Sequence, residues 1–134
     1  TQQVGAGFYT KCVLNPYTHI HSYLNIPDTS ERDSLFQAES RRCKEIIDTI
    51  LDNPEEKGFR HYGIFDELYS GTNPMEASKS AYAFLKYLTK FNNVDFILTT
   101  HYKMKKGISK VQGAVKILES MNYPEEIMNT IKEC

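Results

Sequence analysis

The sequence predicts an α/β fold built on a mostly parallel β-sheet. Two short and mainly apolar runs, residues 61–66 and 94–100, have the length and composition of strands buried in such a sheet. Two longer segments, residues 34–53 and 73–88, carry apolar residues at helical spacing and alternate with these runs. This alternation favours βαβ units, because parallel neighbouring strands must be joined by a long crossover, which is usually a helix.

The first part of the chain predicts two further strands, residues 9–14 and 17–24. Both are rich in aromatic and β-branched residues, and Asn15-Pro16 forms a turn signal between them. His19 and His21 alternate along the second strand, so they share one face of it. That spacing can bind a metal ion, but no third ligand is evident in the sequence. Paired or solvent-facing histidines are therefore the favoured interpretation.

A helix is expected to begin at Ser34. Ser34 and Gln37 match a capping box, in which each side chain accepts a hydrogen bond from a backbone N–H of the other residue. Four apolar residues then recur at helical spacing: Phe36, Cys43, Ile47 and Ile50. The helix is expected to end near Asn53-Pro54, because proline cannot continue a helix.

A second helix has a strong start signal at Asn73. Asn73 can cap the helix, Pro74 suits its first position, and Glu76 stands at its third. Its apolar face is expected to contain five residues: Ala77, Ala81, Phe84, Leu85 and Leu88. Two more helices are predicted from Gly113 onward and after Pro124, where acids fill the first turn.

Composition excludes several classes of protein. The net charge of -1 provides no overall basic field for gripping nucleic-acid phosphates. The three cysteines are widely spaced without a C-x-x-C pair, which argues against a disulfide framework or a zinc site and suits an intracellular compartment, cytoplasmic or nuclear. No apolar run approaches the length of a membrane span, so no membrane partner is expected.

Two adjacent acids, Asp66 and Glu67, follow the predicted strand at 61–66. Carboxylates are costly to bury without a cation or hydrogen bonds, and functional groups gather beyond the carboxyl ends of parallel strands. A nucleotide-hydrolysing site would use both acids. One would help to hold Mg²⁺, usually through water, and the other would orient and deprotonate the attacking water. The alternative is an acidic start to a loop.

Two other residues have both a functional and a structural interpretation. His101 follows the strand at 94–100, where it can donate a hydrogen bond to a γ-phosphate or be a half-buried histidine with a protein partner. Ser34 can cap its helix. The free N–H groups at the same helix start can instead bind a phosphate offered by a partner molecule.

Three segments in a fixed order narrow these alternatives. Ser34, Phe36 and Glu39 match a segment of the form S-T-F-x-x-E. Residues 66–74 match D-E-x-x-x-G-T-S/N-P, and residues 99–102 match A/T-T-H-Y. Together they resemble the signature segment, the Walker B strand with its D-loop, and the switch histidine of the MutS-family ATPase domain. This family is a branch of the ABC-type ATPases with members in large DNA viruses. Its closing segment resembles residues 107–127, so the similarity covers nearly the whole chain.

The resemblance implies an incomplete three-layer P-loop NTPase fold of the ABC type. Residues 1–134 would be part of a single ATPase domain that starts after the phosphate-binding loop, with residues 1–8 as the tail of the helix after that loop. The cofactors would be ATP and Mg²⁺. The partners would be a second ATPase subunit, in a homodimer or a MutS-type heterodimer, and DNA bound by domains outside this segment.

The resemblance also assigns roles to individual residues. Asp66 would assist Mg²⁺, Glu67 would be the general base, and His101 would contact the γ-phosphate. Ser34 would reach across the dimer to nucleotide held by the other subunit. The D-loop that couples the two sites would consist of four residues: Ser70, Gly71, Thr72 and Asn73.

Three departures from the family pattern leave alternatives open. The loop G-x-x-x-x-G-K-[ST] is not in the sequence, the connection after His101 is short, and Leu35 and Gln37 differ from the usual signature. A degenerate ATPase module used for dimerisation or scaffolding is one alternative. Another is an ABC-type ATPase that acts on DNA ends or recombination intermediates, although the closing segment favours the MutS family.

Overall fold

The structure is a computed structural model that describes residues 10–11, 13–24, 26, 34–100 and 113–133. Strands and helices alternate along the described chain, so the α/β class predicted from the sequence is confirmed. The elements are β1 (His19–Tyr23), α1 (Leu35–Asp52), the short 3-10 helix η1 (Glu55–Lys57), β2 (His61–Asp66), α2 (Pro74–Leu88), β3 (Val94–Thr99), α3 (Gly113–Ser120) and α4 (Glu125–Glu133).

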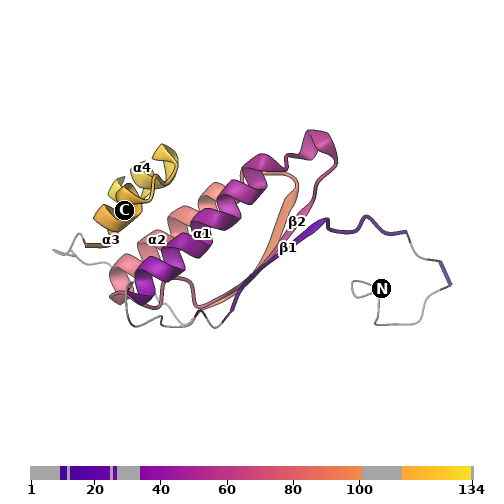
Figure 1. Cartoon of the computed structure of the whole chain (residues 1–134). Helices are drawn as coiled ribbons and strands as arrows, with labels where there is room; N and C mark the ends of the chain where they lie inside the picture. The colour runs from indigo at the N-terminus through magenta and orange to yellow at the C-terminus, as the bar shows by residue number, and fades with distance from the viewer. Residues whose placement is uncertain (1–9, 12, 25, 27–33, 101–112, 134) are drawn as a thin grey trace.

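The three described strands form one parallel sheet in the order β1-β2-β3. Helices α1 and α2 lie side by side along one face of this sheet (Figure 1). This placement is expected, because two crossovers of the same hand between consecutive neighbouring strands bring both helices to the same face. Helices α3 and α4 pack on the outer side of α1 and α2. A helical layer on the other face, as the three-layer P-loop fold requires, remains a prediction.

The predicted helix boundaries are confirmed at both major helices. Ser34 and Gln37 form the complete capping box of α1, and the N–H of Asn53 closes its end. The side chain of Asn73 accepts hydrogen bonds from two backbone N–H groups at the start of α2, with Pro74 in the first turn. These helices begin where the sequence predicts because capping depends only on residues within one turn.

Two strand predictions were wrong in part. The described residues of the segment 9–14 are not in a strand, and the side chains of Val13 and Leu14 are 86% and 55% exposed. β-Branched residues favour a strand only when a neighbour supplies hydrogen bonds, and β1 pairs with β2 only from His19 onward. The strand at 94–100 is not fully buried. Its residues alternate between half-buried and exposed, because helices cover only one face of the described sheet.

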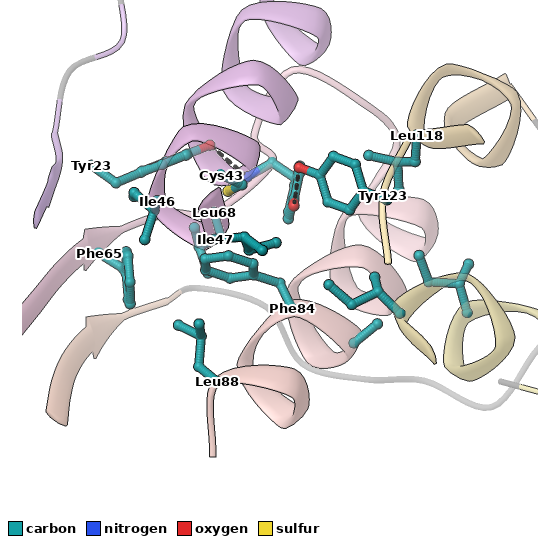
Figure 2. Packing of buried hydrophobic residues seen from close by; sticks show 14 of the residues in the cluster. Tyr23, Cys43, Ile46, Ile47, Phe65, Leu68, Phe84, Leu88, Leu118 and Tyr123 are labelled. Carbon is teal, nitrogen blue, oxygen red and sulfur yellow. Dashed lines mark hydrogen bonds between the residues drawn. The ribbon is translucent and has the colours of Figure 1, made fainter. Parts of the chain in front are cut away.

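The core lies between the covered face of the sheet and helices α1 and α2 (Figure 2). Phe65 of β2 belongs to this core, and its ring makes a T-shaped contact with the Phe84 ring, with 5.5 Å between centroids. Gly63 precedes Phe65 on the same face, and a Cβ at Gly63 would lie 2.6 Å from the Phe65 ring. The small residue therefore leaves the space that the Phe65 ring fills at the middle of the sheet.

Candidate functional site

The carboxyl ends of β2 and β3 bring the predicted metal-binding acid, Asp66, and the predicted general base, Glu67, to one edge of the sheet. Asp66 is the last residue of β2, pairs with Thr99 of β3, and is exposed. The Thr99 hydroxyl donates a hydrogen bond to Oδ1 of Asp66. Glu67 follows, and its backbone N–H donates to the Thr99 carbonyl at 3.2 Å. The sheet itself thus sets the position of both acids.

The turn after β2 contains backbone strain. Glu67 and Tyr69 have φ angles of 49° and 60°, in the left-handed region that residues other than glycine rarely adopt. Such residues cost about 1–3 kcal/mol each and persist only where surrounding contacts require them. Strain of this kind is common at functional sites. Two such residues within three positions therefore make this turn a candidate functional segment.

Burial of Tyr69 and Leu68 holds the strained turn in place. Tyr69 is fully buried, and its backbone N–H donates to the Tyr23 hydroxyl at 3.0 Å. The Tyr123 hydroxyl donates to the Ser40 carbonyl at 2.6 Å, so the Tyr69 hydroxyl must donate to the Tyr123 oxygen at 3.2 Å. Burial raises the pKa of both the Tyr69 and the Tyr123 hydroxyl, which keeps them protonated as donors.

A pocket of about 220 Å³ opens between this turn and the start of α1. Its lining residues come from the ends of β1 and β2, from the segments that follow them, and from the first two turns of α1: Tyr23, Ile26, Leu35, Glu39, Asp66, Glu67 and Ser70. Three of the predicted site residues, Asp66, Glu67 and Ser70, therefore share one pocket at the edge of the sheet where the sequence places the chemistry.

Ser34 lies beside this pocket but has a structural role. Its hydroxyl accepts a hydrogen bond from the N–H of Gln37 at 3.3 Å, and its own N–H donates to Gln37 Oε1 at 2.8 Å. The side chain of Ser34 is exposed, and its neighbour Leu35 lines the pocket. Whether Ser34 also contacts a second molecule stays a prediction.

The predicted D-loop residues divide into two groups. Ser70 and Gly71 are bound to Glu39 of α1, whose carboxylate accepts from both backbone N–H groups and from the Ser70 hydroxyl. Thr72 and Asn73 instead serve the start of α2, since both side chains donate to Oε2 of Glu76. The loop is therefore attached to one helix at its first half and to the next helix at its second half.

Two further expectations concern the histidine and the metal ion of the site. His101, the predicted γ-phosphate contact, lies outside the described residues, as do residues 1–8, the predicted tail of the helix after the phosphate-binding loop. Among the residues that are described, no group of three or more His, Cys, Asp or Glu side chains could hold a metal ion. If Asp66 assists Mg²⁺ as predicted, water molecules and the nucleotide would supply the other ligands of the metal ion.

His21 is a paired histidine, one of the two interpretations that the sequence favoured, but its partner His61 was not predicted. His21 of β1 and His61 of β2 are both buried, and their Nε2 and Nδ1 atoms are 3.0 Å apart. His61 Nε2 lies 2.9 Å from the Asn53 carbonyl and must donate to it, so His21 donates to His61. Burial, followed by the nearby His61, His19 and Arg42, lowers the pKa of His21 to about 4. Burial also lowers the pKa of His61.

Glu39 is a functional candidate to which the sequence reasoning gave no role of its own. It is 2% exposed and lies on the same side of α1 as Phe36 and Cys43. The available signal was its position three residues after Phe36, on the apolar face of a helix. A carboxylate there requires partners, because an unpaired buried charge is strongly unfavourable.

Comparisons with protein-family models, with curated proteins and with solved structures find no match to this chain. Within the described ranges, no helix is both long enough and apolar enough to cross a lipid bilayer.

Proposed function

We propose that this chain is the part of a MutS-type ATPase domain that follows the phosphate-binding loop. ATP binding and hydrolysis would switch a dimeric clamp that holds DNA through domains outside this segment. The observation that carries the proposal is the shared pocket of Asp66, Glu67 and Ser70 at the carboxyl end of β2. The order of the three motifs along the sequence supports it independently.

The carboxylates of Asp66 and Glu67 at this pocket have the charge to attract a Mg²⁺ ion, which would in turn carry the phosphates of a nucleotide. ATP would supply the phosphoanhydride bond, and Mg²⁺ would neutralise charge on its phosphates. Asp66 uses Oδ1 to accept from Thr99, so Oδ2 is the oxygen proposed to hold a water ligand of the metal. Glu67 would accept the proton of the attacking water, from a backbone position fixed by its bond to the Thr99 carbonyl.

Glu67→Gln tests the proposal in a polypeptide that supplies the phosphate-binding loop upstream. Glutamine keeps the size of the side chain but cannot take a proton, so turnover should fall by about 100-fold or more while ATP binding is retained. Steady-state ATPase assays and equilibrium nucleotide binding measure the two quantities. Glu56→Gln is the matched control, because Glu56 is an exposed acid on η1, before the amino end of β2. Turnover at the wild-type rate in Glu67→Gln would defeat the assignment.

A second candidate function is a dimerisation or scaffold module without hydrolysis. Ser34 and Asn73 favour this alternative, because their side chains cap their own helices. Helix capping explains the presence of both residues without a bound nucleotide. The same polypeptide separates the two functions. A scaffold would form dimers without binding ATP, whereas the ATPase would bind ATP and hydrolyse it.

A further inference from the structure

One buried carboxylate joins the two segments of the site that would face a second subunit. Glu39 Oε1 accepts from the Ser70 N–H at 2.9 Å and from the Ser70 hydroxyl at 2.8 Å. Glu39 Oε2 accepts from the Gly71 N–H at 2.9 Å. Hydrogen bonds to an ionised acceptor are stronger than neutral ones, and three of them converge on one side chain.

Close packing at Gly71 reinforces this connection. A Cβ at Gly71 would lie 2.6 Å from the backbone N of Phe36 and 2.8 Å from Cγ of Leu35. No side chain fits there, so the loop backbone lies directly against the first turn of α1. The hydrogen bonds to Glu39 and this contact act on the same two residues, Ser70 and Gly71.

We propose that Glu39 is the positioning residue that fixes the loop at 70–73 on the start of α1, so that Ser34 and Ser70 form one rigid surface for a second ATPase subunit. Both residues are exposed. Ser70 itself bonds to Glu39, and Ser34 precedes Leu35 and Phe36, the two residues that pack against Gly71. The inference rests on the proposed ATPase function for its partner. The attachment of the loop by Glu39 can be measured in the chain alone.

Amide hydrogen exchange in this chain tests the attachment directly. Glu39→Gln replaces one acceptor oxygen by a donor, so at least one of the three loop donors loses its partner. Exchange of the Ser70 and Gly71 amides should become about tenfold faster, as expected for the loss of a hydrogen bond to a charged group. Ser40→Ala is the matched control. Ser40 is the next buried polar residue on α1, and its hydroxyl donates within the helix to Phe36.

Two outcomes of the exchange experiment decide the matter. Faster exchange confined to the loop in Glu39→Gln, with wild-type protection of the loop in Ser40→Ala, supports the proposal. Equal loop exchange in wild type and Glu39→Gln overturns it. If Glu39→Gln does not fold, Ser70→Ala removes one of the donors from the exposed side, and the Gly71 amide should then exchange about threefold faster. No change in that variant overturns the proposal as well.

A kinetic measurement distinguishes positioning from general support of the fold. In a polypeptide with the phosphate-binding loop, Glu39→Gln should lower kcat about tenfold and change KM for ATP by less than about threefold, because the phosphate-binding loop provides most of the contacts that bind the nucleotide. Equal kcat in wild type and Glu39→Gln, in a protein where Glu67→Gln abolishes turnover, refutes the positioning role and leaves the ATPase function standing. Turnover that survives Glu67→Gln refutes the function instead, and the exchange result is unaffected.

Discussion

The histidine pair between β1 and β2 predicts that the protein loses stability in mild acid. In the folded state burial holds the pKa of His21 at about 4, against an ordinary value of 6.5. Between these values the unfolded chain binds a proton at His21 that the folded chain does not. The contribution of His21 is therefore fully present above pH 6.5 and is lost as the pH falls toward 4.

The size of the effect follows from the same two values. Each tenfold change in proton affinity corresponds to about 1.4 kcal/mol, so the free energy of unfolding should fall by about 3 kcal/mol by pH 4 from His21 alone. His61 acts in the same direction, since burial lowers its pKa too. A small domain has a total stability of about 5–15 kcal/mol, so the loss is a substantial share of it.

Comparison with a variant isolates this contribution from the titration of the carboxylates. His21→Gln keeps an N–H donor for His61 Nδ1 and removes the titrating ring. Urea unfolding followed by far-UV circular dichroism, at pH 4 and at about pH 7.5, gives the free energy of unfolding of both proteins. The wild type should lose about 3 kcal/mol more than the variant between the two conditions.

The control is His19→Gln, the same substitution two residues earlier on β1. It leaves the hydrogen bond between His21 and His61 in place, so it should keep most of the pH dependence of the wild type. If the stability difference between wild type and His21→Gln is the same at both pH values, His21 is not protected from protons in the folded state. The reasoning from burial is then refuted.

Two further substitutions test the loop and the helix start. Gly71→Ala should lower the free energy of unfolding by about 1–3 kcal/mol, measured by urea unfolding, because the added carbon meets the backbone of Phe36 and cannot be moved aside. An unchanged midpoint would contradict the close contact. Ser34→Arg, in a complete ATPase, should spare nucleotide binding and block nucleotide-dependent dimerisation in sedimentation experiments. Ser34→Ala also removes the cap of α1 but adds no bulk, so it should still dimerise. Loss of dimerisation in both variants would attribute the effect to the cap and count against a contact between subunits.

Local signals account for what the sequence could predict about the fold. The starts of α1 and α2 were predicted at Ser34 and Asn73 because a cap involves only residues within one turn. The strand at 61–66 was predicted with its observed bounds because it is a short apolar run between turn signals. The strand prediction for residues 9–14 was wrong, because strand formation depends on a neighbouring strand that composition does not reveal.

The sequence predicts the part of the candidate site that directly follows a strand, but not the contacts between distant segments. Asp66 and Glu67 follow a parallel strand, so their place at the carboxyl edge of the sheet followed from the fold class alone. The bonds from Ser70 to Glu39, 31 positions apart, depend on how α1 packs against the loop. The contact of His21 with His61 depends on strand register, 40 positions apart, and no periodicity in one segment encodes it.

The two halves of the candidate site are held by different parts of the fold, and in the proposed ATPase this division would provide a route for coupling between subunits. Asp66 and Glu67 are bound to Thr99, so they move with the sheet. Ser70 is bound to Glu39 and therefore moves with α1, as does Ser34 at the start of that helix. A small displacement of α1 along the sheet would change the distance from Ser34 and Ser70 to Glu67 while leaving the acids in place. The strained residues at positions 67 and 69 lie between these two attachments, where such a displacement would have to be absorbed.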